Sequence, residues 1–350
     1  MGSVVDGIEI ESLQMRASWE TICWGCGLRV ILPKYAPMFR CGWCGAITID
    51  NADIKPVSPW SRRCSKGRDQ VFVFLVLSLT FSIICGGVWS TFPVLFPTAT
   101  VGFYIHSAIT TILSFNTLFN YCMAAFRRAG PPPTVEWGRY DLVPRQALEG
   151  YKFCVYCKLP KPPNAHHCRS CQSCVIEMDH HCPFIGNCVG SNNHRHFLLF
   201  LLFATASGFY VLTMSTYVGS KVWPNMVRFR RANTPRLHGG ASYDVLADLL
   251  VTMFLSMEPA ASTRAFSLIF LCIASFSLVI GVGLLLYHQV KLVYTGETYI
   301  DSLSSSGRGH DQDKSWTNLR KVFGKQHPFL WLLPRISSKC LQASVKSHAG

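Results

Sequence analysis

Cysteine and histidine recur between residues 154 and 197 at the spacings of metal ligands. The pattern Cys-x2-Cys begins at Cys154 and again at Cys168, and each pair places two thiolates within reach of one tetrahedral zinc at about 2.3 Å. Further candidate ligands follow in the same stretch: His166, His167, Cys174, His181 and Cys188. We predict two zinc sites, because six cysteines and two histidines would supply the eight ligands that two four-coordinate zincs need. The spacing does not choose between His166 and His167, nor does it divide the ligands between the sites.

One carboxylate, one imidazole and one thiol in this stretch are not needed for zinc, and they lie close together at Asp179, His180 and Cys182. A cysteine with a pKa of about 8.5 is mostly protonated at neutral pH, so a nearby base must activate it. His180 can take the proton, and Asp179 can hold the imidazole in the right tautomer. The three residues therefore have the parts of an activated sulfur nucleophile.

The whole stretch resembles the cysteine-rich domain of the DHHC family of protein S-acyltransferases, or palmitoyltransferases. The resemblance rests on residues 179–183, which read Asp-His-His-Cys-Pro, and on residues 187–190, which read Asn-Cys-Val-Gly. It implies that Cys182 takes the acyl group of palmitoyl-CoA and passes it to a cysteine of a membrane-associated protein. It also implies that His180 is the base and that Asp179 orients it.

The resemblance further implies how the ligands divide between the two zincs. One zinc would be held by Cys154, Cys157, His167 and Cys174. The other would be held by Cys168, Cys171, His181 and Cys188. His166 then has the ordinary role of a packing or hydrogen-bonding neighbour.

A third zinc site is predicted near the N-terminus, where two Cys-x2-Cys pairs make a ribbon of four ligands: Cys23, Cys26, Cys41 and Cys44. The ribbon resembles small plant zinc fingers of the lesion-simulating-disease type, which indicates a plant member of the family. It departs from those fingers at Leu32 and Tyr35. We expect a partner-binding or stabilising module rather than a catalytic one.

The composition predicts a membrane protein, because 49% of the residues are hydrophobic and only 15% are charged, against about 25% in soluble domains. Four uncharged apolar runs lie at residues 71–92, 101–123, 197–218 and 266–287. Each is close to the roughly 20 residues that cross a bilayer. The expected fold is a polytopic α-helical membrane protein with four transmembrane helices and the zinc-binding domain between the second and third.

Basic residues flank these runs on the side of the cysteine-rich loop: Arg62, Arg63, Lys66, Arg68, Arg127, Arg128, Arg195 and Lys291. By the positive-inside rule, both termini and the cysteine-rich loop are expected in the cytosol. Arginines at 228, 230, 231 and 236 oppose this orientation, but they are fewer and lie farther from helix ends.

The resemblance implies an endomembrane location: Golgi, endoplasmic reticulum, vesicles or plasma membrane. The net charge of +14 suits anionic lipid headgroups rather than nucleic acid.

We predict the following division of the chain: a cytosolic N-terminal region at 1–69 with the ribbon at 23–44, a hairpin of the first two transmembrane helices at 70–126, the cytosolic catalytic domain at 127–196, the third transmembrane helix at 197–218, a lumenal loop at 219–264, the fourth transmembrane helix at 265–288, and a cytosolic tail at 289–350.

Within the lumenal loop, apolar periodicity at 243–257 predicts an amphipathic helix, either interfacial or capping the bundle. Residues 302–313 have the composition of a linker. Residues 316–324 resemble a C-terminal segment that in the family packs back on the cysteine-rich domain.

The third apolar run contains small residues from Ala204 to Gly208, which either let helices approach closely or leave a cavity for the acyl chain. Ser207 lies ten residues into this run, about 15 Å deep at 1.5 Å per residue. That depth is close to the reach of a long acyl chain, and the family keeps its chain-length gate near it. We therefore name Ser207 as a candidate acyl-binding residue.

The chain departs from the family pattern at three places. Phe184 replaces a usual Trp, Ala-Gly-Pro at 129–131 stands for Asp-Pro-Gly, and Thr-Tyr-Ile-Asp at 298–301 stands for Thr-Thr-x-Glu. These changes bear on the rate of the reaction rather than on its class. The competing hypotheses are a non-catalytic zinc-finger scaffold that binds partner proteins, and a channel or transporter. A scaffold has no need of the Asp179, His180 and Cys182 group, and a channel would carry paired polar residues inside its spans.

Overall fold

The computed structural model describes residues 20–32, 38–49, 58–233, 259–304 and 316–333. The chain divides into two compact units. One comprises Met1–Asp69, Arg128–Asn193 and Thr298–Ser304, and the other comprises Gln70–Arg127, His194–Glu297 and Ser305–Gly350. The helix expected at 243–257 and residues 305–313 of the expected linker lie outside the described residues, whereas residues 302–304 end a short helix.

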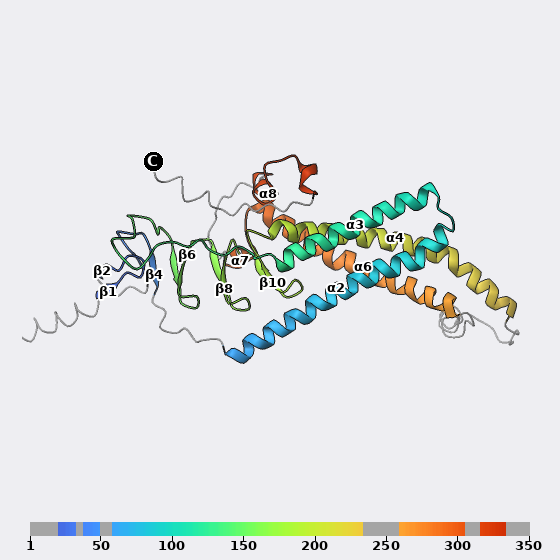
Figure 1. Cartoon of the computed structure of the whole chain (residues 1–350), viewed down its shortest axis with the longest axis horizontal. Coiled ribbons are helices and arrows are strands. Elements are labelled where there is room, and N and C mark those ends of the chain that lie inside the picture. The colour runs from blue at the N-terminus through green and yellow to red at the C-terminus, as the bar shows by residue number, and fades with distance from the viewer. Residues whose placement is uncertain (1–19, 33–37, 50–57, 234–258, 305–315, 334–350) are drawn as a thin grey trace, which may run out of the picture. The chain divides into compact units, whose positions relative to one another are not determined.

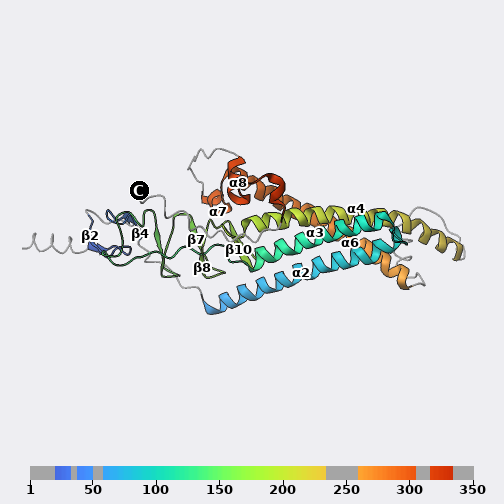
Figure 2. The same ribbon diagram turned by 45° about the horizontal axis from the view of Figure 1, so that its top comes forward.

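Four long helices dominate the second unit: α2 (Pro59–Leu95), whose first residues up to Asp69 belong to the first unit, α3 (Val101–Phe126), α4 (His194–Asn233) and α6 (Pro259–Thr295). Each is long and apolar enough to cross a membrane, and they run side by side (Figures 1 and 2). The predicted fold class is therefore confirmed. Helix α2 starts well before its apolar run, because Pro59 suits a first helical position and the Ser58 hydroxyl accepts a hydrogen bond from the N–H of Ser61 at 3.2 Å.

Small residues bring the helices together. A Cβ built on Gly208 of α4 would lie 2.9 Å from side-chain carbons of both Leu278 and Val279 of α6, so the glycine permits the close approach of these two helices. On another face of α4, the Ser207 hydroxyl lies 3.2 Å from the Thr117 hydroxyl of α3. The run of small residues therefore lies where α4 meets both α3 and α6.

Helix α8 (Trp316–Phe323) packs against α4 and α6. Its Leu319 shares an apolar cluster with Leu198 and Val293, and its Asn318 amide donates a hydrogen bond to a carbonyl of α6 at 3.2 Å. The resemblance implied packing on the cysteine-rich domain instead. The described contacts are with transmembrane helices, because the buried side of α8 offers apolar side chains that match those of α4 and α6.

The first unit is built from antiparallel pairs of short strands: β1 (Glu20–Ile22) with β2 (Arg29–Ile31), β3 (Met38–Arg40) with β4 (Ile47–Ile49), β5 (Lys152–Cys154) with β6 (Leu159–Lys161), β7 (Ala165–Cys168) with β8 (Ser173–Ile176), and β9 (His180–Cys182) with β10 (Asn187–Val189). Two short helices complete the described elements: α7 (Tyr299–Ser304) and the 3-10 helix η1 (Pro328–Trp331). An isolated hairpin is at best marginally stable in water. Interactions between hairpins must therefore hold this unit.

The N-terminal ribbon shares a sheet and a core with the region before the second cysteine cluster. Strand β4 pairs in parallel with β5, with Ile47 opposite Lys152, so the sheet order is β3-β4-β5-β6. The N–H of Leu148 donates to the carbonyl oxygen of Cys44 at 2.9 Å. Val143 and Leu148 pack among the four ribbon cysteines. The ribbon and the segment that leads to β5 therefore form one folded layer, which the separate spacing of the two motifs did not indicate.

Replacing Leu148 with alanine should lower the free energy of unfolding of this layer by about 2–5 kcal/mol, the usual cost of truncating a buried leucine. Leu148 is 1% exposed, whereas Leu142 is 45% exposed, so Leu142→Ala is a matched control that should cost less than about 1 kcal/mol. Denaturant unfolding monitored by tryptophan fluorescence measures both. Equal effects of the two variants would contradict the shared core.

Candidate metal centres and catalytic cysteine

Each Cys-x2-Cys pair lies at the turn of a hairpin, and the residue after its second cysteine has a left-handed backbone. In the ribbon these residues are Gly27 and Gly45, with φ of 74° and 79°. In the second cluster they are Lys158 and Gln172, with φ of 53° and 54°. A left-handed residue with a side chain costs about 1–2 kcal/mol. The turns at 158 and 172 therefore need a further constraint, and a metal bound to both cysteines would provide one.

The first candidate cage joins two successive hairpins. Cys154 and Cys157 lie at the β5–β6 turn, while His167 and Cys174 are directly opposite one another on β7 and β8. The four ligand atoms lie within 4.8 Å of one another, and the Nδ1 atom of His167 is 3.5 Å from the Cys154 sulfur. Side chains alternate along a strand, so His166 points to the other face of β7. Strand alternation thus distinguishes the two histidines, which spacing did not.

The second candidate cage repeats this plan one hairpin later. Cys168 and Cys171 lie at the β7–β8 turn, and His181 is directly opposite Cys188 on β9 and β10. These four ligand atoms also lie within 4.8 Å of one another. The other ring nitrogen of His181, Nε2, lies 2.9 Å from a carboxylate oxygen of Asp69. Asp69 has no motif in the sequence around it, so sequence reasoning missed it.

The distances suit a tetrahedral zinc. Metal–sulfur bonds of about 2.3 Å imply sulfur–sulfur edges of about 3.8 Å, and a nitrogen ligand at about 2.0 Å implies edges of about 3.5 Å. The sulfur atoms of Cys171 and Cys188 are 3.5 Å apart, and those of Cys157 and Cys174 are 3.8 Å apart. The distances from the histidine Nδ1 atoms to the sulfurs of their cages run from 3.2 to 4.0 Å. A disulfide would need about 2.05 Å.

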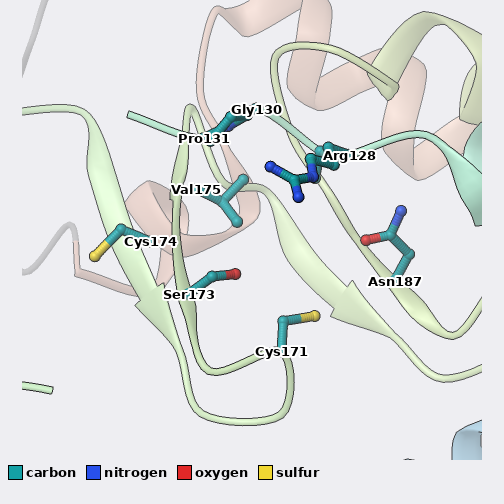
Figure 3. A pocket seen from close by; sticks show the side chains of 9 residues that line it. Arg128, Gly130, Pro131, Cys171, Ser173, Cys174, Val175 and Asn187 are labelled. Carbon is teal, nitrogen blue, oxygen red and sulfur yellow. The ribbon is translucent and has the colours of Figure 1, made fainter. Parts of the chain in front are cut away.

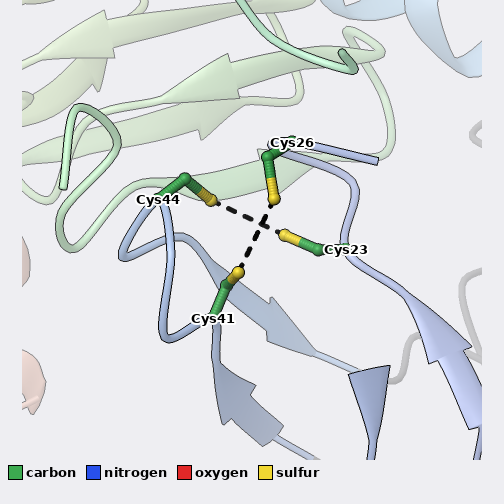
Figure 4. A group of neighbouring side chains, drawn as sticks. All are labelled: Cys23, Cys26, Cys41 and Cys44. Atoms are coloured by element: carbon green, nitrogen blue, oxygen red, sulfur yellow. Dashed lines mark hydrogen bonds between the residues drawn. The ribbon is translucent and has the colours of Figure 1, made fainter. Parts of the chain in front are cut away.

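The four ribbon cysteines converge in the same way, as Figure 4 shows. The sulfur of Cys23 lies 3.7 Å from that of Cys44, and the sulfur of Cys26 lies 3.7 Å from that of Cys41. Burial raises the pKa of the Cys23 thiol to about 11 and also raises the pKa of Cys44. Thiolates packed this closely need a compensating positive charge, which a divalent cation at their centre supplies.

The predicted nucleophile and base lie on one face of strand β9. Because side chains alternate, His180 and Cys182 share this face, while His181 points into the second cage from the other. Asp179, just before the strand, is fully buried, and its Oδ2 atom accepts a hydrogen bond from His180 Nδ1 at 2.6 Å. His180 also shares a hydrogen bond with the side chain of Cys182. The structure therefore brings together the three residues named as catalytic from the sequence.

Helix α7 holds the second oxygen of the Asp179 carboxylate. The backbone N–H of Tyr299 donates to Asp179 Oδ1 at 2.7 Å, and the Tyr299 ring lies edge-on to the ring of His180 with a centroid separation of 6.5 Å. Tyr299 belongs to the segment that departs from Thr-Thr-x-Glu. A backbone donor does not depend on side-chain identity, which explains how this segment can support Asp179 despite its altered sequence.

The surroundings of His180 favour its charged form. Burial lowers the pKa of the imidazole, but the hydrogen bonds to Asp179 and Cys182 and their negative charges outweigh it and raise the pKa to about 9. At neutral pH the proton therefore resides on His180. The imidazolium can then stabilise a thiolate at Cys182, which is 6% exposed.

The segment at 129–131, which stands in place of Asp-Pro-Gly, belongs to the first unit. The N–H of Ile176 donates to the carbonyl oxygen of Gly130 at 2.8 Å. Gly130 has a φ of 130°, and a Cβ there would collide with the Ser191 hydroxyl oxygen, so only glycine fits. A hollow of about 340 Å³ adjoins it, and Figure 3 shows the polar ends of Arg128, Ser173 and Asn187 around this hollow. Cys171 and Cys174 also line the hollow, so it lies beside both cages.

Comparison with known proteins adds to this geometry. A family model described as DHHC palmitoyltransferase matches residues 148–306. The chain is 29% identical over 262 residues to palmitoyltransferase ZDHHC3 of Rattus norvegicus, covering 73% of this chain and 75% of that protein. It is 30% identical over 230 residues to palmitoyltransferase ZDHHC3 of Homo sapiens, covering 64% and 67%. It is also 36% identical over 141 residues to palmitoyltransferase ZDHHC16A of Danio rerio, covering 40% and 34%.

Replacing Cys154 or Cys171 with alanine should each remove about one bound zinc per chain and lower the yield of folded protein, because structural zinc contributes about 10–16 kcal/mol in small zinc domains. Elemental analysis of purified protein and its thermal unfolding measure both effects. Cys64 is exposed and lies outside the cages, so Cys64→Ala should leave zinc and stability unchanged. A stable, fully active Cys154→Ala or Cys171→Ala protein that lacks that zinc would contradict the assignment.

Proposed function

This chain belongs to the DHHC family of palmitoyltransferases, and on that premise we propose that it forms an acyl-enzyme at Cys182 and transfers the acyl group to cysteines of membrane-associated proteins. The geometry of Asp179, His180 and Cys182 carries the proposal. A buried carboxylate, an imidazole hydrogen-bonded to it and a thiol on the same strand face are the components of a sulfur nucleophile. A non-catalytic scaffold would leave this arrangement without a role.

In the first step, the thiolate of Cys182 attacks the carbonyl carbon of the acyl-CoA thioester. The bond between this carbon and the CoA sulfur breaks, and the departing CoA thiolate takes the proton held by His180. Asp179 keeps the imidazole ring in place through the 2.6 Å hydrogen bond, and the Tyr299 N–H keeps Asp179 in place. The product is a thioester on Cys182.

In the second step, a cysteine thiol of the protein substrate attacks the acyl group on Cys182. His180, now neutral, takes the proton of the incoming thiol, and the Cys182 thiolate leaves. The positive charge on His180 stabilises this leaving thiolate, so the raised pKa that aids the first step also aids the second. The enzyme returns to its starting protonation state, and no other reactant is needed.

We assign structural zinc to the two cages beside the catalytic strand and a third zinc to the ribbon. The ligand sets are those named from the sequence: Cys154, Cys157, His167 and Cys174; Cys168, Cys171, His181 and Cys188; and Cys23, Cys26, Cys41 and Cys44. When bound, zinc supplies the cross-links between hairpins, and it takes no part in the transfer of the acyl group. The layer shared by the ribbon and the segment before β5 supports a stabilising role for the ribbon.

The basic residues beside the helices support a cytosolic location for the ribbon, the catalytic domain and the C-terminal tail. Acyl-CoA is anionic and cytosolic, so this orientation gives Cys182 access to its donor. The domain boundaries proposed from the sequence follow from the same argument, and an endomembrane location follows from the family. Arg128 places positive charge at the hollow beside the two cages, which suits a phosphate of the CoA moiety.

The acyl chain is proposed to extend along α4 toward Ser207. The hydrogen bond between Ser207 and Thr117 at the α3–α4 contact would close the end of such a path, whereas the neighbouring Gly208 packs against α6. Phe184, just after Cys182 and 53% exposed, offers an apolar ring near the reacting thioester without a buried polar group to satisfy.

Replacing Cys182 with serine should abolish formation of a hydroxylamine-labile adduct from labelled palmitoyl-CoA while leaving the zinc content at the wild-type level, because Cys182 is outside every cage. Cys122→Ser is the control, since Cys122 is an exposed cysteine of α3 and should leave labelling unchanged. Labelling that survives in Cys182→Ser, or the loss of one zinc, would show that the roles of the cysteines are assigned wrongly.

Replacing Ser207 with phenylalanine should shift the donor preference toward shorter acyl-CoAs. Each buried methylene contributes about 0.8 kcal/mol, so excluding three or four of them should cost an 18-carbon donor about 2–3 kcal/mol relative to a 14-carbon donor. Competition between the two donors for labelling of Cys182 measures the shift. Thr213→Phe, at an exposed position of the same helix, is the control. An unchanged preference in stable Ser207→Phe protein would mean that Ser207 only packs against α3.

A further inference from the structure

Asp69 makes a contact with the second cage that neither the motif nor the family assignment explains. This aspartate lies near the start of α2 and is only 6% exposed. The Nε2–H of His181, 112 residues later in the chain, donates a hydrogen bond to Asp69 Oδ2 at 2.9 Å. The opposite ring nitrogen, Nδ1, faces the sulfur atoms of the cage at 3.3 to 3.7 Å. The two nitrogens of this imidazole therefore have separate partners.

We propose that Asp69 is a positioning residue of the second zinc cage, which fixes His181 in the tautomer and ring orientation that present the Nδ1 lone pair to the metal. This inference rests on the zinc cages of the proposed function. A ligating imidazole that donates its other N–H to a carboxylate is held in place and becomes a stronger donor. Removing such a partner typically costs 10–100-fold in metal affinity.

The carboxylate of Asp69 is itself oriented for this task. Its Oδ1 atom accepts hydrogen bonds from the Arg68 guanidinium at 2.9 and 3.1 Å, which leaves Oδ2 to His181. A second contact joins the same part of α2 to the cage. The Ser65 hydroxyl donates to that of Ser170, between the two cysteines of the β7–β8 turn, at 3.3 Å. The first turns of α2 thus contact both halves of the second cage.

The first cage offers an internal comparison, because its histidine lacks this support. His167 also turns Nδ1 toward the sulfurs of its cage, but within the described residues its buried Nε2 atom has no hydrogen-bond partner. The Tyr156 ring stacks on the imidazole instead, with centroids 4.8 Å apart and planes inclined by 20°. The two cages therefore orient their histidines by different means, and only the second should depend on a carboxylate.

The second cage is also the one that bears on catalysis. His181 lies between His180 and Cys182, so the ring that Asp69 orients belongs to the strand that carries the reacting groups. Loosening His181 should loosen the register of this strand. Asp69 lies immediately before the apolar run of α2, which makes the start of the first transmembrane helix part of the support for the active-site hairpin.

The test compares Asp69→Asn and Asp69→Ala in the full-length purified protein. Zinc transfer to a chromophoric chelator should show one zinc per chain released 10–100-fold faster in Asp69→Ala, with the remaining zinc released at the wild-type rate. Asp69→Asn should lie between, because its amide oxygen can accept the His181 N–H but carries no charge. After exchange with Co²⁺, the visible spectrum of one site should change while the thermal unfolding of Asp69→Asn stays near that of the wild type.

Asp141→Asn is the matched control. Asp141 also forms an ion pair with an arginine, Arg139, at 2.8 Å, but it is exposed and belongs to none of the candidate cages. It should leave zinc release and the cobalt spectrum unchanged. Wild-type release from both Asp69 variants, or uniform acceleration of every zinc in the isosteric Asp69→Asn, would overturn the proposal. If the proposed zinc sites themselves were wrong, the wild-type protein would hold no tightly bound zinc, so that outcome is distinguishable from an error about Asp69.

Discussion

The convergence of cysteine and histidine side chains into groups that could hold a metal ion is the constraint on which the rest of the first unit depends. Its strands are only three or four residues long, and each of the two candidate cages between residues 154 and 188 takes one Cys-x2-Cys turn from one hairpin and one histidine–cysteine pair from the next. The hairpins are thereby linked in series. The ribbon extends this series at its N-terminal end, and the β4–β5 pairing joins it to the second cluster through backbone hydrogen bonds rather than metal. A metal bound at each cage supplies stability that apolar burial cannot provide in so small a domain.

The same arrangement sets the chemistry. Residues 180–182 form a strand, and a strand sends alternate side chains to opposite faces. The central histidine of the motif can therefore enter the second cage while the side chains of His180 and Cys182 share the opposite face of the strand. The second cage and the proposed nucleophile Cys182 are then coupled, because a shift of His181 along the strand also moves its two neighbours. The buried Asp179 accepts a hydrogen bond from the backbone of α7, so the proposed catalytic group is supported by a segment more than a hundred residues away in sequence.

Contacts from outside the motif also explain how the chain tolerates departures from the family pattern. The altered segment at 298–301 still supplies a backbone N–H to Asp179, and the Gly130 carbonyl oxygen accepts a hydrogen bond from the Ile176 N–H, so both contacts are made by backbone groups. Asp69 adds a carboxylate from the start of α2 to the second cage. The positions of Asp179 and His181 within the motif therefore depend on hydrogen bonds from α7 and α2, which lie far from the motif in the sequence.

The sequence by itself determined the family and the fold class of the protein, and it named the candidate residues of the site. An apolar run of about 20 residues predicts a membrane-spanning helix, and a Cys-x2-Cys pair predicts a metal-binding turn, because both patterns follow from short-range geometry. Spacing alone left open the choice of His167 over His166 and the division of ligands between the cages; the resemblance implied both, and strand register gives the physical reason. The sharing of a core between Leu148 and the ribbon was decided only by the tertiary structure. So were the hydrogen bonds of Asp69 and Tyr299. These depend on strand register and on contacts between distant segments, and no local pattern encodes such contacts.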